Sequence, residues 1–525
     1  MAAKGIKPFI SILFLLITIL YSCKDGYDYP EKVEQALQKA KGNRATLEKL
    51  IEHYRANAAD SLKLKAAYFL IANMEGHYYV KAKLVDTSGK RVNFDVLSYP
   101  DYKTMVAAWD STEKKKGKLD YIRDTVIYDL QSIGYDFLKT NIDLAFEAWE
   151  KPWSDFLTFD QFCEYVLPYR GSNEPLEEWR QYFFEKYGWV SDSLTDKSDP
   201  VEAAVLINNE IKRWYSFDPI FYRHPTDLGL DEMLEYKRGR CEDMTNLAIY
   251  AMRSQGIAVM SDYTPAWPNT GNNHAWNALI DRNGKVVIFM GDGANPGEYR
   301  LNNKKAKVYR KTFAVQNNCL AMIKPYWEKV PRWLSGKNYI DVTKEYIPVF
   351  QVKVDFTYPQ PDSINYAYLA VFNSGEWKAI HWGKIENNSA LFSDMGGDIV
   401  YLPAYYKNGK LIPAGEPFIL DNNGKQIPLK PDTTKLINVK LYSTTKKVTR
   451  KATDEIRITS FKKGTPYTLY YWDKEWKKLG TAKAKKDMPL RFSVPGNALL
   501  WLVKKDSNKE ERIFTVMPGG AQKWW

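Results

Sequence analysis

The chain has 525 residues, more than one hydrophobic core holds, so several domains are expected. Hydrophobic residues make up 45% and charged residues 26% of the chain, a balance that excludes the disordered and fibrous classes. The formal net charge is +12, but the lysines are interspersed with acidic residues and no nucleic-acid-binding signature accompanies them. We therefore expect no nucleic-acid partner.

The N-terminal segment 1–22 has the pattern of a secretion signal. Lys4 and Lys7 precede an apolar run over residues 9–20, which is too short to span a bilayer comfortably. Cys23 comes directly after this segment and is followed by polar residues. The order "LYSC" resembles a bacterial lipoprotein box, in which Cys23 would be lipidated and become the mature N-terminus. An ordinary signal peptide that contains a cysteine is the alternative.

This resemblance implies a protein of the cell envelope that is anchored to a membrane through an N-terminal lipid. The outer membrane is the expected place. Exposure at the cell surface is a further expectation, since Lys24-Asp25 is similar to the surface-export signal of Bacteroidetes lipoproteins. In an oxidising compartment Cys163, Cys241 and Cys319 allow at most one disulfide and leave at least one free thiol. Such a thiol is either a reactive group or a buried packing residue.

Residues 23–195 are predicted to form a mainly helical N-terminal region. Apolar residues recur every three or four positions from about residue 30 to residue 150, with a break at Gly42-Asn43. Two further helical stretches follow, "LTFDQFCEYVLPYR" and "EPLEEWRQYFFEKYGW". Cys163 falls on an apolar face of the first stretch, and we expect it to be a core residue.

The central region, residues 196–340, begins with a predicted helix, "DPVEAAVLINNEIKRWYSFDP". The stretch "KRGRCEDMTNLAIYAMRSQG" then predicts a helix that starts at Cys241 and is capped by Gly256. At a helix N-terminus, unpaired N–H groups and the helix dipole favour a thiolate over a thiol. We therefore expect a lowered thiol pKa and treat Cys241 as a candidate nucleophile.

Two strand-like segments follow, "HAWNALID" and "KVVIFMGD". His274 begins the first and is the best-placed of the five histidines to act as a base. A three-residue turn with a bulge at Gly284 pairs Asp281 with Lys285 and places His274 opposite Asp292. A two-residue turn would shift the register by one residue and turn Asp292 away. We favour the first register because it gives the acid a partner.

The order of these features over roughly residues 199–312 resembles the transglutaminase-like superfamily: a cysteine at a helix N-terminus, "RSQGI", "HAW" and an aspartate one strand later. The resemblance implies a papain-like fold with a triad of Cys241 as nucleophile, His274 as general base and acid, and Asp292 as the group that orients the imidazole. The chain departs from the family at the acid, where "GDGANPGE" replaces the common Asp-Pro. Asn295 is therefore an alternative third member. The wider layout resembles transglutaminase-domain lipoproteins of Bacteroidetes.

Residues 341–440 and 441–525 predict two β-sandwich-like modules, because short strands alternate with Gly, Asn and Pro turns. An internal repeat supports the pair: "FSDMGGDIVYL" matches "FSVPGNALLWL", and Trp377 and Trp476 precede these motifs at nearly the same offset. We expect most of the aromatic side chains to fill the module cores. Exposure on a ligand surface is the alternative.

These patterns predict an α+β multidomain protein that acts as a cysteine hydrolase of the cell envelope. Cys241 would attack an amide or peptide bond of a peptide, protein or cell-wall glycopeptide and form an acyl-thioester. Hydrolysis of this thioester by water ranks above transfer to an amine. The alternative function is a non-catalytic surface lipoprotein that binds glycan or protein through its modules. No metal-ligand spacing, phosphate loop or dinucleotide fingerprint is present, so we expect no metal and no cofactor.

The oxyanion of such a reaction needs hydrogen-bond donors. The backbone N–H of Cys241 is a candidate donor, and Trp214 and Trp276 are candidate neighbours of the site.

Overall fold

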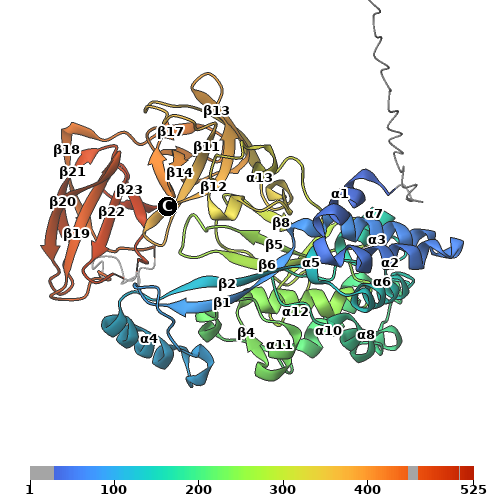
Figure 1. Ribbon diagram of the computed structural model, residues 1–525. Coiled ribbons are helices and arrows are strands. Elements are labelled where there is room, and N and C mark those ends of the chain that lie inside the picture. The colour runs from blue at the N-terminus through green and yellow to red at the C-terminus, as the bar shows by residue number, and fades with distance from the viewer. Residues whose placement is uncertain (1–28, 447–458, 508) are drawn as a thin grey trace, which may run out of the picture.

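The computed structural model describes residues 29–446, 459–507 and 509–525. Three parts follow one another along the chain: a mainly helical part, a mixed central part and a strand-rich C-terminal part (Figure 1). This arrangement confirms the predicted α+β multidomain class. The predicted signal segment 1–22 and Cys23 lie outside the described residues. Within the described ranges, no helix combines the length and the apolar character needed to cross a bilayer.

The N-terminal helices pack around one apolar core. Leu37, Leu50 and Leu70, one from each of the first three helices, are fully buried in it. The break predicted at Gly42-Asn43 falls in the short turn between the first two helices. The helices of this core are α1 (Glu31–Lys39), α2 (Arg44–Arg55), α3 (Ser61–Asn73), α6 (Tyr135–Trp149) and α7 (Phe159–Tyr165). Cys163 lies on α7 and is 2% exposed, which confirms it as a core residue.

A pair of antiparallel strands interrupts this helical part and was not predicted from the sequence. β1 (Tyr78–Val85) pairs with β2 (Asp120–Tyr128), and α4 (Tyr102–Lys116) lies between them along the chain. β1 is rich in tyrosine and valine, which favour strands. Helical periodicity on both sides of β1 hid this signal, so these two strands were missed within a region predicted to be mainly helical.

The central part is built on a five-stranded antiparallel sheet with the order β7-β6-β5-β8-β9. Its strands are β5 (Val259–Thr264), β6 (His274–Ile280), β7 (Val286–Phe289), β8 (Tyr309–Lys311) and β9 (Tyr339–Asp341). The N-terminal helices cover one face through Met260 and Ala278. Helix α12 (Cys241–Arg253) covers the other face through Val259 and Leu279, because successive strand residues point to opposite faces.

The central strand β5 was also not predicted. All 6 of its residues are buried. A strand that is covered on both faces has no alternation of apolar and polar residues, so periodicity does not reveal it. The two strands that were predicted, β6 and β7, are both present.

The C-terminal part contains two modules with the same strand order, which confirms the predicted pair of β-sandwich-like modules. In the first, β10 pairs with β13 and a second sheet runs β12-β11-β14-β16-β17, with β15 beside β14. In the second, β18 pairs with β21 and the other sheet runs β20-β19-β22-β23-β24. The domain boundaries placed along the chain stay predictions.

The strands of the first module are β10 (Val349–Asp355), β11 (Tyr366–Asn373), β12 (Glu376–Lys384), β13 (Ser389–Gly396), β14 (Ile399–Lys407), β15 (Lys410–Pro413), β16 (Phe418–Leu420) and β17 (Gln426–Pro428). Those of the second are β18 (Asp432–Leu441), β19 (Pro466–Asp473), β20 (Glu475–Lys483), β21 (Leu490–Gly496), β22 (Leu500–Lys504), β23 (Ile513–Val516) and β24 (Gln522–Trp524).

The two repeated tryptophans pack where the modules meet. Trp377 and Trp476 each make an edge-to-face contact with the buried ring of Phe372, at 5.5 and 5.6 Å between ring centroids. Trp377 also contacts Trp472 of the second module at 5.4 Å. These half-buried tryptophans therefore join the two modules.

Candidate active site

Cys241 is the first residue of α12, where the sequence predicts it. The residue is half-buried, and its sulfur accepts a hydrogen bond from the backbone N–H of Ala275. Ala275 follows His274 at the start of β6. The structure therefore brings the predicted nucleophile and the predicted base to neighbouring positions.

The thiol of Cys241 does not have the lowered pKa expected from its place at the helix N-terminus. Burial raises the pKa to about 11, and the charge of Glu242 adds to the effect. The N–H of Ala275 and the charge of Arg240 lower it, but less strongly. The carboxylate of Glu242 is itself paired with Lys311 of β8. Such a shift favours the neutral thiol of Cys241 over the thiolate at neutral pH.

His274 is half-buried, and its one side-chain hydrogen bond within the described part of the chain joins Nε2 to the hydroxyl of Tyr299, at 2.7 Å. Burial lowers the pKa of the imidazole. Burial together with the nearby Cys241 raises the pKa of the Tyr299 phenol to about 12, so the phenol stays protonated. Tyr299 was not predicted as a site residue. It lies 25 residues after His274 in a loop without a recognisable motif, and no pattern in the sequence marks it.

The β6–β7 hairpin has the predicted register. The N–H of Asp281 donates to the carbonyl of Lys285 at 3.0 Å, and Gly284 has a φ of 74°, as the bulged three-residue turn requires. The ladder ends at the pair Asn277 and Phe289, so it does not reach the first residues of β6.

Asp292 is therefore not paired with His274 in the ladder. It has a φ of 62° in the turn that the bond from the Met290 N–H to the Ala294 carbonyl closes, and its backbone N–H donates to Oδ1 of Asn208 at 3.0 Å. Burial raises the pKa of the Asp292 carboxyl to about 7, although the charge of Lys212 acts against this shift. No hydrogen bond or ion pair connects the Asp292 carboxylate to His274 in the described ranges.

Asn295, the alternative third member, is engaged elsewhere. Its Oδ1 accepts hydrogen bonds from Asn208 at 3.0 Å and from Lys212 at 2.7 Å, and its amide donates to Asn209 at 3.1 Å. These partners belong to α10 (Pro200–Ile211) and to Lys212, the residue that caps its end. The structure therefore uses Asn295 to fix the loop after β7 against α10, and not to hold His274.

The two tryptophans proposed as neighbours of the site differ in position. Trp276 lies on β6 and donates from Nε1 to the Tyr346 hydroxyl at 3.0 Å, which in turn donates to buried Asp262 at 2.6 Å. This chain of hydrogen bonds fixes the strand that carries His274. Trp214 instead packs against Tyr215, with 5.7 Å between ring centroids.

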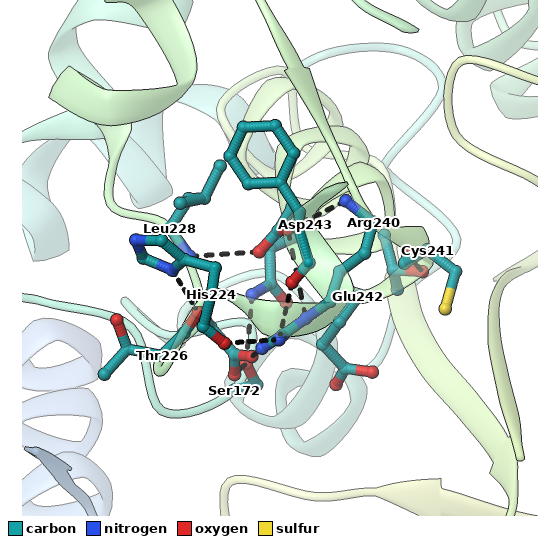
Figure 2. A network of polar contacts seen from close by, with 12 residues as sticks. Ser172, His224, Thr226, Leu228, Arg240, Cys241, Glu242 and Asp243 are labelled. Carbon is teal, nitrogen blue, oxygen red and sulfur yellow. Dashed lines mark hydrogen bonds and ion pairs between the residues drawn. The ribbon is translucent and has the colours of Figure 1, made fainter. Parts of the chain in front are cut away.

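A dense polar network supports the start of α12 on the side away from the thiol (Figure 2). Arg240 pairs with Asp227 at 2.6 Å, and Asp227 accepts a hydrogen bond from the Ser172 hydroxyl at 2.5 Å. Asn246, on the next turn of α12, donates to the same hydroxyl at 2.9 Å. The sulfur of Cys241 points away from Ser172 and Asp243 in Figure 2.

Asp243 closes the network at the first turn of the helix. Its carboxylate accepts the backbone N–H groups of Arg240 at 2.9 Å and of Leu228 at 3.0 Å. The first of these bonds caps the helix. Arg240 is the residue before the first turn, so its N–H has no acceptor within the helix, and the Asp243 carboxylate provides one. The network thereby fixes the backbone that presents Cys241.

The loop that leads into His274, residues 265–273, is fixed by the C-terminal modules. The amide of Asn373 at the end of β11 donates to three carbonyls of this loop at 2.8–3.0 Å. Buried Arg512 of the second module also donates to one of these, the carbonyl of Thr270, and to a fourth, that of Pro268. The accepting carbonyls are those of Trp267, Pro268, Thr270 and Asn272.

In the described part of the chain, no group of three His, Cys, Asp or Glu side chains is arranged to hold a metal ion. The chemistry that the site offers is that of a thiol beside an imidazole.

Residues 188–289 match the sequence model of the transglutaminase-like superfamily. A search of curated proteins finds no match to this sequence. Among solved structures, one named "Putative Cysteine Protease from Cytophaga hutchinsonii" is similar at 11% identity over 31% of this chain, with a TM-score of 0.18. The chain spans 57% of the length of that protein. The family match covers α12 and the β6–β7 hairpin, and the resemblance drawn from the sequence is thereby confirmed: residues 188–289 of this chain form a transglutaminase-like domain.

Proposed function

We propose that this protein hydrolyses amide or peptide bonds and that Cys241 is its nucleophile. The hydrogen bond from the N–H of Ala275 to the Cys241 sulfur carries the proposal, because it holds the thiol beside His274 within the transglutaminase-like domain. Peptides, proteins and cell-wall glycopeptides are the substrate classes that contain such bonds in a cell envelope.

The first half of the reaction forms an acyl-thioester. As the sulfur of Cys241 attacks the carbonyl carbon, the thiol proton moves to a ring nitrogen of His274. The carbonyl electron pair moves to the oxygen, and the backbone N–H of Cys241 is the proposed donor of a hydrogen bond to it. The C–N bond then breaks, and His274 returns its proton to the leaving amine.

The second half releases the acid. Water attacks the thioester carbonyl while His274 takes one of its protons, the C–S bond breaks, and the proton returns to the sulfur. An amine in place of water would give transamidation by the same steps. Hydrolysis is the proposed outcome because water is always present at high concentration.

The test uses the intact protein with a panel of peptides, simple amides and peptidoglycan fragments, with release of free amine as the readout. We expect Cys241→Ala and His274→Gln to lower the rate by at least about a thousandfold. Cys319→Ala is the matched control, since Cys319 is also a free cysteine, and it should keep the rate within about threefold. If Cys241→Ala cleaves as fast as the native chain, the proposed mechanism is wrong.

The alternative, capture of glycan or protein by Trp377 and Trp476, is less well supported. Both side chains pack between the two modules, so neither forms an open platform for a ligand.

The location of the protein is a separate proposal. The apolar segment before Cys23 supports lipidation of that residue and anchoring at the outer membrane. Incorporation of a labelled fatty acid that Cys23→Ser abolishes would support it. Equal labelling of the variant would contradict it.

A further inference from the structure

We propose that Tyr299 is the positioning residue that orients the imidazole of His274, in the role that the family pattern gives to an aspartate. This inference rests on the proposed function, because it concerns the base of that same site. The role of third triad member, beside Cys241 and His274, then falls to neither Asp292 nor Asn295.

The geometry around His274 carries the proposal. The imidazole has one hydrogen bond in the described ranges, from Nε2 to the Tyr299 hydroxyl at 2.7 Å. Asn295 is already bonded to Asn208 and Lys212, and Asp292 lies past the point where the chain leaves the β6–β7 ladder. Of the three side chains, Tyr299 is the one that makes a hydrogen bond to the ring in the described part of the chain.

A partner at one ring nitrogen decides what the other nitrogen can do. A neutral imidazole has one N–H and one lone pair, so an oxygen that accepts Nε2–H leaves the lone pair on Nδ1. Nδ1 can then take the proton of the Cys241 thiol. In the proposed arrangement the Tyr299 oxygen accepts Nε2–H, and this is the tautomer in which His274 acts as a base.

A phenol differs from a carboxylate in one respect that can be measured. Both can hold the ring in place, but only a carboxylate supplies a negative charge that stabilises an imidazolium. With Tyr299 as partner, the resting pair is a neutral thiol and a neutral imidazole, and the thiol proton leaves only during attack. The raised pKa of Cys241 and the lowered pKa of His274 agree with this state. The other ionisable groups that act on the thiol are Arg240, Glu242, Asp243, Tyr222 and Tyr299.

The first measurement needs no substrate and no variant of Tyr299. The nitrogen chemical shifts of the native protein with ¹⁵N-labelled histidine report the tautomer, and His274→Gln identifies which of the five histidine signals belongs to His274. We expect Nε2 to carry the proton and Nδ1 to be bare at pH 7. A proton on Nδ1, or an imidazolium at that pH, would overturn the proposal.

The second measurement has two parts: alkylation of Cys241 in the native chain, and the kinetics of Tyr299→Phe compared with those of Asp292→Asn. Alkylation of Cys241 by iodoacetamide, followed by mass spectrometry across pH, should show no low-pH plateau in the native chain, since a plateau marks a preformed thiolate–imidazolium pair. With a cleaved substrate, Tyr299→Phe should lower kcat roughly ten- to a hundredfold at unchanged KM, and Asp292→Asn should change it less than about threefold. The reverse order of the two variants would assign the role to Asp292.

These outcomes separate the inference from the proposed function. If no amide is cleaved by the native chain, the proposed function fails, while the tautomer and the alkylation profile still test Tyr299. If amides are cleaved and Tyr299→Phe keeps both the native tautomer and the native kcat, the proposed function stands and the inference is wrong. Unfolding midpoints of both variants identify any loss that is due to folding.

Discussion

The two sides of the α12 N-terminus are built differently. On one side, Arg240, Asp227 and Ser172 form a chain of short polar contacts with the helix, and the Arg240 and Asp227 side chains are only 19% and 14% exposed. On the other side, the side chains of Cys241 and His274 each make one hydrogen bond within the described residues. We call the first the framework side and the second the reacting side.

This difference has a physical reason. Buried polar groups rigidify a structure when they find partners, and the side chains of Arg240, Asp227 and Ser172 do so. A nucleophile and a base must keep free lone pairs for the substrate, so the reacting side contributes little to stability. The framework side thus fixes the backbone to which the sparsely bonded reacting groups are attached. Each of the following variants tests this division.

Arg240→Met is expected to have the largest effect. It leaves the Asp227 carboxylate without its cation in a largely buried place and removes donors to the carbonyls of Phe221 and His224. Loss of one partner of a buried ion pair costs about 3–5 kcal/mol, so the unfolding midpoint in urea should fall clearly. The matched control is Arg213→Met, whose ion pair with Glu210 involves an arginine side chain that is 77% exposed. The control should change stability by less than about 1 kcal/mol, and equal effects of the two variants would contradict a framework at Arg240.

Arg512→Met tests whether the framework extends to the C-terminal modules. This side chain donates to the carbonyls of Pro268 and Thr270 in the loop before His274 and to those of Phe372 and Trp525. Unsatisfied buried carbonyls should cost about 2–3 kcal/mol. Hydrogen exchange in residues 265–273 should become faster. Lys523→Met, which removes a surface contact to Asp398 at 3.6 Å, is the control and should leave that exchange unchanged. Unchanged exchange in Arg512→Met would show that the modules do not hold the loop.

Glu164→Gln tests the polar contact between α7 and the residues after β8 through the pH dependence of the unfolding free energy. Glu164 lies on α7 and accepts the N–H groups of Phe313 and Ala314, which follow β8. Burial raises the pKa of its carboxyl to about 7, so the folded state binds a proton more tightly than the unfolded state does. Stability from this group is therefore full below the unfolded pKa of about 4.3 and is lost as pH rises through about 7.

The unfolding free energy of the native chain should thus fall by about 1–3 kcal/mol between pH 5 and pH 8 through this carboxyl. In Glu164→Gln this part of the pH dependence should disappear, because the amide does not titrate. Parallel pH curves for the two proteins would show that Glu164 is already charged in the folded state.

Local patterns predicted those parts of the molecule that local chemistry determines. Cys241 at a helix start, the bulged turn at Gly284 with its register, and the repeat of the two modules all follow from short-range signals, and each is present. β5 was missed because burial on both faces removes its periodicity.

The same patterns could not identify Tyr299, the proposed partner of His274. The hairpin register correctly indicated where Asp292 would lie if the ladder continued, but the ladder ends at Phe289 and Asp292 lies in the turn that follows. Tyr299 reaches His274 only through the folded path of the loop after β7. A contact that depends on such a path has no signature in the sequence around either residue.

Cys241→Ala is expected to have the smallest effect on stability, although it should have the largest effect on activity. The substitution removes one weak hydrogen bond, from the N–H of Ala275 to sulfur, at a half-buried position. The unfolding free energy should change by less than about 1 kcal/mol. Arg240→Met, one residue earlier in the chain, should cost several times as much, so the two neighbours form a direct comparison of the framework and reacting sides. If Cys241→Ala destabilises the protein as much as Arg240→Met does, the thiol is itself a structural group. Its loss of activity would then report unfolding, and the division between the two sides would not hold.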